Sequence, residues 1–340
     1  MDSQNVLVRR LTNNDLNDIV SLLKEFYPEW SMDYCREWWI NKYDKNPYGE
    51  PMNYGAYIDG ILAGIECCMP IEYVNGDKNV MMLISCDSKV RVAYRGRGIW
   101  SKVVRYCVKD VFDNSEYPLI LGFPNYRNSY PGYQKMEWQT IDQMHNYLMV
   151  NSANKFAKAF GGRKLIKRFI GRMLVLQRAI VSMTNTSSYK VEPCNNSALL
   201  WDDDNNRIHL AHGDAMLDWK RLYKEIKTVN IKCRGMQVAS CIYSFGEFEN
   251  ELICKIEKFV SIGENQRIKK RAFSALLKYL KKNVPEAAFV RIWTMEDTEV
   301  EQLCNKCLMI RAKHPNPFII KQRGGEYDNS RWNLSFFDLD

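Results

Sequence analysis

The segment of this sequence best suited to chemistry is a basic, glycine-rich turn, Tyr94-Arg95-Gly96-Arg97-Gly98-Ile99-Trp100-Ser101. Gly96 and Gly98 leave no side chain between the backbone and a ligand, so successive N–H groups can point at an anion. Arg95 and Arg97 add positive charge beside those N–H groups. The turn therefore predicts a site for a phosphate or pyrophosphate group.

The elements on either side of the turn strengthen that prediction. Residues 80–92 alternate apolar with polar or small side chains, as a half-buried strand does. Beyond the turn, apolar residues recur at helical spacing at Ile99, Val103, Val104, Cys107, Val108 and Val111. Two other nucleotide-binding patterns are excluded, because no Gly-Lys-Ser/Thr follows and the turn lacks the third glycine of the dinucleotide fingerprint.

The turn resembles the pyrophosphate loop of the GNAT superfamily of N-acetyltransferases, which reads Arg or Gln, two residues, Gly, one residue, then Gly or Ala. Arg95 and Gly98 fit this signature, whereas Trp100 places a bulky indole at its last position. The resemblance implies that the segment binds acyl-CoA, either acetyl-CoA or 3-hydroxybutyryl-CoA. The expected coenzyme contacts are Val90, Val92, Arg95, Gly96, Arg97, Gly98, Ile99, Trp100 and Ser101.

A second resemblance follows the apolar stretch 119–123. In this superfamily the strand after the loop helix ends in an Asn near the cofactor, and the next helix carries a Tyr-x-Lys-x-Gly-aromatic run. The matching residues are Asn125, Tyr133, Lys135 and Trp138, with Glu137 where glycine is usual. The resemblance implies that Asn125 and Ser129 contact the coenzyme. It also implies that the Tyr133 phenol protonates the departing thiolate, although an isolated tyrosine is more often a core residue.

Acyl transfer to an amine also needs a group that accepts the proton of the amine. Asp87, near the end of the strand before the turn, is the first candidate for this base, although a turn-capping role stays open. Glu66, in the hairpin segment Gly64-Ile65-Glu66-Cys67, is the second candidate. The backbone N–H of Val90 is expected to polarise the thioester carbonyl, because family members splay two strands there.

Composition limits the remaining possibilities. The 340 residues suffice for two domains, and 48 basic against 40 acidic residues give a net charge of +8 without a nucleic-acid motif. The first residues lack a signal peptide, and no apolar stretch is long enough to span a bilayer. The 11 cysteines form no disulfide framework, and Cys304 and Cys307 are a lone CxxC pair. We therefore expect a cytoplasmic protein with no metal and no nucleic-acid partner.

The order of elements predicts an α+β GNAT fold, duplicated along the chain. Residues 1–150 show strand, two helices, antiparallel strands, then strand-loop-helix-strand-helix, which is the order of a catalytic acyl-CoA-binding domain. Residues 191–340 repeat this order, but Ser261-Ile262-Gly263-Glu264-Asn265 has one glycine and an acid in place of the basic loop. This second copy is expected to bind no coenzyme and to shape the acceptor site or act as a scaffold.

The predicted linker, 151–190, is basic and helical. Within 155–182, lysines and arginines alternate with apolar residues and no acid occurs. Peripheral contact with an anionic membrane is one interpretation of this pattern, and a connecting helix with a solvated basic face is the favoured one.

The doubling resembles the two-domain acyltransferases of bacterial surface-polysaccharide clusters, including those that N-acylate dTDP-linked amino sugars in O-antigen, lipopolysaccharide or capsule synthesis. The segments that carry this resemblance are Asp87-Ser88-x-Val90, Gly122-Phe123-Pro124-Asn125 and Trp332-Asn333-Leu334 with Asp338-Leu339-Asp340. The resemblance implies direct transfer of an acetyl or 3-hydroxyacyl group from CoA to the amino group of a dTDP- or UDP-linked amino sugar.

The acceptor is expected near the first two helices, through Trp30, Arg36, Trp39 and Lys42, although aromatic residues in helices are more often core. Two alternatives stay open. The acceptor is another amine, such as a peptide, a lysine or an aminoglycoside, or else the protein is a non-catalytic acyl-CoA-binding scaffold. Trp100 and Glu137, which replace small residues, prompt the scaffold alternative. The oligomeric state stays open as well.

Overall fold

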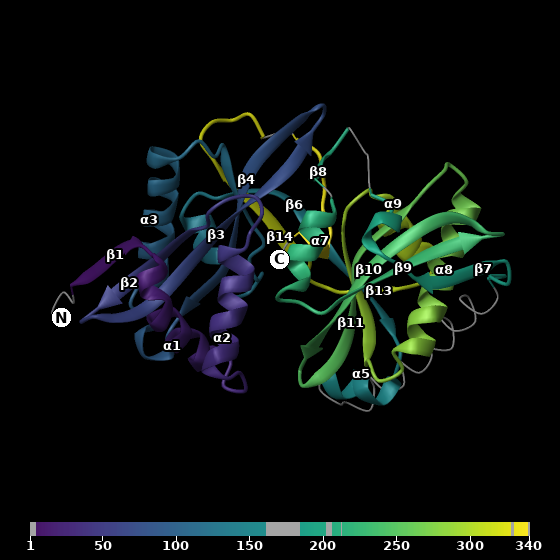
Figure 1. Ribbon diagram of the computed structural model, residues 1–340, viewed down its shortest axis with the longest axis horizontal. Helices are drawn as coiled ribbons and strands as arrows, with labels where there is room; N and C mark the ends of the chain where they lie inside the picture. Colours follow the sequence, from purple (N-terminus) through teal and green to yellow (C-terminus); the bar gives the residue numbers. More distant parts are fainter. Residues whose placement is uncertain (1–4, 161–183, 202–205, 212, 328–329, 339–340) are drawn as a thin grey trace. The chain divides into compact units, whose positions relative to one another are not determined.

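The computed structural model describes residues 5–160, 184–201, 206–211, 213–327 and 330–338 (Figure 1). Two compact units are formed. Unit 1 consists of Met1–Asp142, Asn205–Tyr223 and Asn316–Arg331, and unit 2 of Gln143–Asp204, Lys224–Pro315 and Trp332–Asp340. The sequence predicted consecutive domains, 1–150 and 191–340. In the structure, each compact unit is made of three separate segments of the chain.

Unit 1 is built on a mixed sheet. Its strands lie in the order β1 (Val6–Arg10), β2 (Met52–Ile58), β3 (Ile61–Asn75), β4 (Lys78–Val90), β5 (Leu119–Gly122) and β14 (Asn316–Gln322). All neighbours are antiparallel except β4 and β5, which are parallel. The short strand β8 (Ile208–Leu210) pairs with the far part of β3. The strands up to β5 follow the predicted order, and β8 and β14 were not predicted.

Helices cover both faces of this sheet. They are α1 (Leu16–Phe26), α2 (Met32–Trp39) with its π-helical continuation η2 (Ile40–Asp44), α3 (Ile99–Asn114), α4 (Tyr130–Lys135) and α7 (Asp214–Arg221). Side chains of β2 show which helix lies on which face. The Tyr54 hydroxyl donates to Asp110 of α3 at 2.8 Å, and the Tyr57 hydroxyl donates to Asp15, next to α1, at 2.8 Å. Helices α1 and α3 therefore cover opposite faces.

The face under α3 holds an apolar core that fixes where this helix begins. Its apolar stripe, predicted from the spacing, is buried at Ile99, Val103, Val104, Cys107 and Val111. It packs on alternate residues of β2, from Met52 to Ile58, and on Tyr133 and Met136 from the α4 region. The buried Ile99 anchors the first turn of α3, so the glycine-rich turn before it is held at the end of β4.

Unit 2 repeats this architecture. Its strands lie in the order β6 (Gln139–Val150), β12 (Phe289–Met295), β11 (Glu251–Ser261), β10 (Met236–Phe248), β9 (Ile226–Cys233) and β7 (Tyr189–Pro193), and β13 (Ile310–Arg311) also pairs with β6. Only β11 and β12 are parallel among the strand pairs described in this unit. Its helices are α5 (Ala153–Ala159), α8 (Gln266–Asn283) and α9 (Glu299–Lys306). The succession β11-α8-β12-α9 confirms the predicted repeat of β4-α3-β5-α4.

The two units exchange one strand each. In the chain, β6 follows α4 of unit 1, yet it pairs antiparallel with β12 of unit 2 from Met144 to Val150. Conversely, β14 follows α9 and β13 of unit 2, yet it pairs antiparallel with β5 of unit 1. Each sheet is thus extended next to its parallel pair by a strand from the other half of the sequence.

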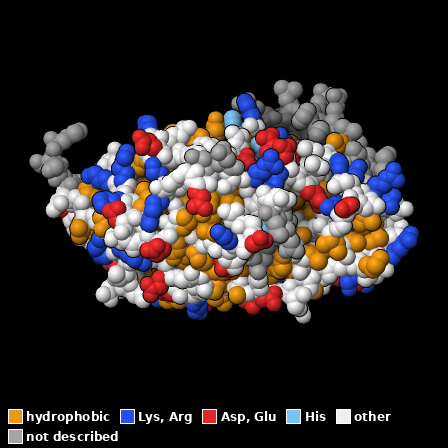
Figure 2. Space-filling view, turned by 90° about the horizontal axis from the view of Figure 1, so that it is seen from above, with side chains coloured by type: hydrophobic (Ala, Val, Ile, Leu, Met, Phe, Trp, Pro, Cys, Tyr) orange, Lys and Arg blue, Asp and Glu red, His pale blue; other side chains and the backbone are white. Residues whose placement is uncertain are grey.

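Most of the predicted basic helix, 155–182, lies outside the described residues. Its described beginning belongs to α5, where Phe156 packs against Phe289 of β12 with ring centroids 5.5 Å apart. No helix among the described residues is long and apolar enough to cross a membrane. On the face seen in Figure 2, basic and acidic side chains are interspersed.

Candidate active site

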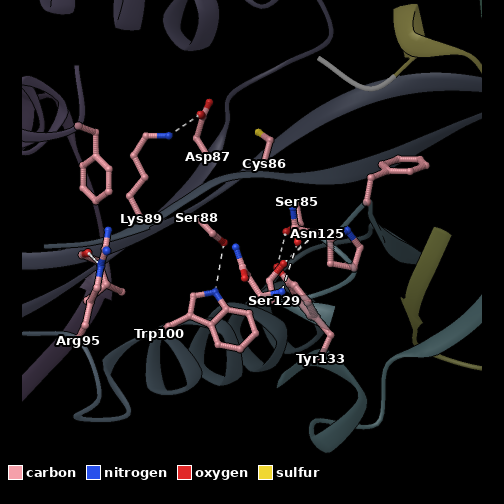
Figure 3. A pocket seen from close by; sticks show the side chains of 15 residues that line it. Ser85, Cys86, Asp87, Ser88, Lys89, Arg95, Trp100, Asn125, Ser129 and Tyr133 are labelled. Carbon is pink, nitrogen blue, oxygen red and sulfur yellow. Dashed lines mark hydrogen bonds and ion pairs between the residues drawn. The ribbon is translucent and has the colours of Figure 1, made fainter. Parts of the chain in front are cut away.

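The parallel strands β4 and β5 separate and leave a cavity between them. Their pairing ends at Ser85 and Gly122, after which β4 continues along β3 to Val90 while the chain after β5 turns away through Pro124. The cavity has a volume of about 750 Å³, which is within the range of small-molecule sites. It is lined by Phe26, Ser85, Cys86, Asp87, Ser88, Lys89, Val90, Arg95, Trp100, Phe123, Pro124, Asn125, Asn128, Ser129 and Tyr133 (Figure 3).

The glycine-rich turn lies at one end of this cavity. Gly96 and Gly98 have φ of 76° and 73°, a left-handed conformation that other residues adopt at a cost. Gly98 caps α3, so the first N–H groups of this helix have no partner within the helix itself. Arg95 lines the cavity and donates from Nε to the Val90 carbonyl at 3.1 Å. The turn has the geometry of an anion-binding helix N-terminus.

The predicted coenzyme contacts fall into two groups. Val90, Arg95, Trp100, Asn125 and Ser129 line the cavity. Six others do not line it: Val92 lies in the short 3-10 helix before the turn, and the rest belong to the turn and the start of α3, namely Gly96, Arg97, Gly98, Ile99 and Ser101. Ile99 is a core residue, and Val92 is 63% exposed.

Trp100 forms one wall of the cavity instead of filling the anion site. Its ring lies against Gly132, where a Cβ atom would overlap Trp100 Cζ3. The ring also meets Tyr133 edge-on, with centroids 4.8 Å apart, and its Nε1 donates to Ser88 Oγ at 3.3 Å. Gly132 therefore makes room for the indole that departs from the family signature.

A β-bulge in β4 places Asp87 at the cavity wall and Glu66 behind that wall. Ile65 pairs with Lys89 and Cys67 with Cys86, so Asp87 and Ser88 together lie opposite Glu66 alone. Asp87 has φ of 47°. The extra residue bends the strand and redirects side chains, as bulges near active sites do. Asp87 and Ser88 line the cavity, whereas Glu66 lies behind the wall.

Asp87 is neutralised by lysines. Its carboxylate accepts from Lys42 Nζ at 2.6 Å, from the Tyr43 hydroxyl at 2.7 Å and from Lys89 Nζ at 3.0 Å. Burial alone would raise the pKa of Asp87, but the two ammonium groups hold that pKa well below its usual range. A carboxylate held in this way is a weak base.

Glu66 has the opposite environment. It is 1% exposed, and its two oxygens accept hydrogen bonds from Ser85 Oγ and Ser88 Oγ. Burial raises the pKa of Glu66 to about 7, although both serine hydroxyls favour the ionised form. The Asp87 charge contributes a smaller rise to the same pKa. Glu66 can therefore take up and release a proton near neutral pH.

Tyr133 completes this group. Its hydroxyl lies 3.2 Å from Ser85 Oγ, and its ring packs against Trp100 and Trp138. Burial, followed by the nearby Glu66 charge, raises the pKa of Tyr133 well above its usual value. The phenol is accordingly protonated at neutral pH and available as a proton donor.

The four predicted acceptor residues do not line this cavity. Lys42 is buried against Asp87, and Arg36 donates to Asn17 at 2.7 Å. Trp30 stacks on Tyr27 with centroids 4.1 Å apart. Trp39 lines a separate cavity of about 640 Å³ that also includes Arg10 and Asn53.

Several residues of the site were not predicted. Ser85 and Ser88 hold Glu66, and Phe26 and Lys89 line the cavity. A signal for the serines is present in the sequence, because Ser85, Asp87 and Ser88 lie within four positions directly after the apolar run from Val80 to Ile84. A metal-binding group of His, Cys, Asp or Glu is absent from the described part of the chain.

Comparison with known proteins agrees with this geometry. Residues 7–141 match the model of the acetyltransferase (GNAT) domain. No curated protein sequence matches the chain. The match covers the cavity and the candidate acid and bases, so this part of unit 1 is similar to the GNAT acetyltransferase domain.

Solved structures are similar over most of the chain. A GCN5-related N-acetyltransferase from Anabaena variabilis is 10% identical with a TM-score of 0.60, covering 94% of this chain and 73% of that one. A tandem GNAT protein from the clavulanic acid biosynthesis pathway is 10% identical with a TM-score of 0.57, covering 94% and 99%. N-myristoyltransferase from Saccharomyces cerevisiae with bound myristoyl-CoA is 9% identical with a TM-score of 0.59, covering 95% and 80%. At such identities the likeness shows the fold alone, and it confirms the predicted duplicated GNAT fold.

Proposed function

We propose that the chain, whose residues 7–141 match the model of the GNAT acetyltransferase domain, transfers an acyl group from acyl-CoA directly to an amine. The observation that carries this proposal is the cavity between β4 and β5, which the glycine-rich turn and Tyr133 both border. The turn would hold the pyrophosphate through the N–H groups at the start of α3. The pantetheine arm would then run between the strands towards Tyr133.

The residues of the wall divide the proton chemistry between them. Tyr133, kept neutral by burial, would protonate the departing thiolate. Glu66, with a pKa of about 7, would take the proton of the attacking amine. We propose Glu66 for this role in preference to Asp87, because Lys42 and Lys89 already neutralise the Asp87 carboxylate.

For the acceptor we propose a nucleotide-linked amino sugar, of the dTDP or UDP class used in surface-polysaccharide synthesis. Supporting this, one edge of the cavity combines cations with aromatic rings. Lys89 Nζ lies 5.2 Å from the Tyr27 ring centroid, and Arg95 Cζ lies 5.7 Å from that of Phe26. Such an edge suits a diphosphate attached to a planar base.

The test is release of free thiol from acetyl-CoA and 3-hydroxybutyryl-CoA, measured with dTDP- and UDP-linked amino sugars, lysine peptides and aminoglycosides. We expect turnover with one nucleotide-linked sugar. Tyr133→Phe should slow it by roughly 10- to 100-fold without weakening CoA binding. Tyr130→Phe is the matched control, because Tyr130 lies on the same helix and its hydroxyl contacts Thr140 at 2.9 Å, away from Glu66.

Two results would contradict the proposal in different ways. Turnover of a lysine peptide or an aminoglycoside alone would keep the transferase and overturn the acceptor. Tight CoA binding without turnover of any amine would overturn the enzyme and favour an acyl-CoA-binding scaffold.

A further inference from the structure

Glu66 is separated from the cavity by the two residues that bind it. Its carboxylate is buried and does not line the cavity, whereas Ser85 and Ser88, which donate to its two oxygens, both do. An amine in the cavity therefore cannot hand a proton to Glu66 directly. The proton has to pass through a hydroxyl group of the wall.

The hydrogen bonds of Ser85 define one route. Ser85 Oγ donates to Glu66 Oε1 at 2.5 Å, so its single proton is committed and its oxygen accepts from the Tyr133 hydroxyl at 3.2 Å. When Glu66 is ionised, the Tyr133 hydroxyl donates to Ser85 and the Ser85 hydroxyl donates to Glu66. Figure 3 shows Ser85 and Tyr133 on the same side of the cavity.

Ser88, which binds the other oxygen of Glu66, has a different hydrogen-bond donor. Ser88 Oγ donates to Glu66 Oε2, and the hydrogen bond it accepts comes from Trp100 Nε1 at 3.3 Å. An indole N–H only donates and cannot take up a proton at neutral pH. Ser88 also lowers the pKa of Tyr133, but less than Ser85 does, so this branch reaches Tyr133 more weakly and mainly fixes the second carboxylate oxygen.

Building on the proposed function, we infer that Ser85 relays the proton of the amine to Glu66 and later relays the same proton back to Tyr133. Tyr133 and Glu66 then act at the two ends of one reversible line of hydroxyl groups. The acid and the base of the reaction share a single proton, which Glu66 stores between the two steps.

The protons balance at each step. As the amine nitrogen bonds to the thioester carbon, its proton moves to Tyr133 Oη, the Tyr133 proton moves to Ser85 Oγ, and the Ser85 proton moves to Glu66 Oε1. When the carbon–sulfur bond breaks, the sulfur keeps the bonding electron pair and takes a proton from Tyr133. Tyr133 is then reprotonated from Ser85, and Ser85 from Glu66, so all three side chains end as they began.

One hydroxyl can serve both steps because nitrogen and sulfur are attached to the same carbon in the tetrahedral intermediate. The protonation of Glu66 reverses the direction of the hydrogen bonds, since a neutral carboxyl group donates where a carboxylate accepts.

Unit 2 has the same strand arrangement but lacks this line of hydroxyl groups. The positions that match Ser85 and Glu66 relative to its own bulge are Lys255 and Ile242.

The experiment compares Ser85→Ala with Ser88→Ala, a matched variant that removes the other hydrogen bond to the same carboxylate. For the wild type we expect kcat/KM to rise as the pH passes about 7, the pKa of Glu66. Ser85→Ala should lower kcat at least about 100-fold and abolish this inflection. Ser88→Ala should keep the inflection, displaced to higher pH. Ser85→Thr, which retains a hydroxyl group, should restore most of the rate.

The outcomes separate the relay from the proposed function. A wild-type protein that turns over no amine overturns both. A wild type that turns over while Ser85→Ala keeps its rate and its pH inflection overturns the relay alone. Equal losses in Ser85→Ala and Ser88→Ala, with the inflection kept in both, would assign Ser85 a purely structural role. CoA binding, measured in every variant, verifies that the cavity has survived.

Discussion

The two units share an acid at the same bulge, but only unit 1 has a second acid on the neighbouring strand, because Glu66 of unit 1 corresponds to Ile242 of unit 2. Strand β11 of unit 2 has a bulge at Glu257, between residues that pair with Ile242 and Tyr243, just as β4 of unit 1 has one at Asp87. Glu257 is bound by Lys224 at 2.9 Å, as Asp87 is by Lys42 at 2.6 Å. Since the acid–lysine pair also occurs in unit 2, it supports the bulge and is not a mark of catalysis.

The region that binds the coenzyme in our proposal differs between the units. Gly98 leaves the start of α3 open, whereas Asn265 caps α8 with its own side chain, accepting from Arg267 N at 3.0 Å. In unit 2, the carboxylate of Glu299 on α9 accepts from Ser261 at the end of β11 and from Lys269 of α8. An internal acid and an internal cap thus take the hydrogen bonds that an anionic ligand would need.

The largest expected effect tests whether the acid–lysine pair is structural. Asp87→Asn leaves the buried Lys42 without its counter-charge and should cost about 3–5 kcal/mol of stability. Glu257→Gln should cost less, because the Lys224 side chain is 22% exposed and can reach water. Calorimetric unfolding of both variants measures the difference. If Asp87→Asn abolished turnover while unfolding like the wild type, Asp87 would be the base after all.

A smaller effect concerns the pH dependence of stability in unit 1. Burial raises the pKa of Glu66 from 4.5 to about 7, so between these values the folded state binds more protons than the unfolded state. Stability should therefore fall as the pH rises from about 4.5 to about 7, by roughly 3 kcal/mol in all. Unfolding by urea at a series of pH values measures this slope. Glu66→Gln should flatten it, and an unchanged slope in that variant would assign the dependence to other groups.

The smallest effect compares two glycines in equivalent loops. Gly98 and Gly263 have φ of 73° and 79°, and a Cβ at either position would meet no atom within 4 Å. Replacement by alanine should therefore cost each unit about 1–2 kcal/mol through backbone strain alone. Only Gly98→Ala should weaken CoA binding, by roughly tenfold, as measured by calorimetric titration. Equal weakening by both variants would place coenzyme in unit 2 as well.

Much of the fold could be predicted because its signals are local. The alternation in 80–92 and the helical spacing after Ile99 predicted β4 and α3 close to their observed bounds. The exchange of β6 and β14 could not be predicted. A strand's partner depends on contacts between distant segments, which local sequence patterns do not contain.

The site was predictable to a lesser degree. The turn and Tyr133 could be located because family motifs identify them, and both border the cavity. The sequence ranked Asp87 above Glu66 as the base, and reversing that order required knowledge of their surroundings. Lys42 lies 45 residues from Asp87 in sequence, and Ser85 lies 19 residues from Glu66. The pKa of a carboxyl group depends on such neighbours, which the linear order of residues does not reveal.

The exchange of strands also limits how this protein can fold during synthesis. The sheet of unit 1 gains its strand beside β5 only when residues 316–322 have left the ribosome, long after β5 itself has been made. Until then β5 is an edge strand with unpaired backbone groups next to the future active site. A fragment that ends at residue 150 would retain the proposed catalytic groups but would lack β14. We therefore expect such a fragment to fold less stably than the full chain, with β5 exposed as an edge strand.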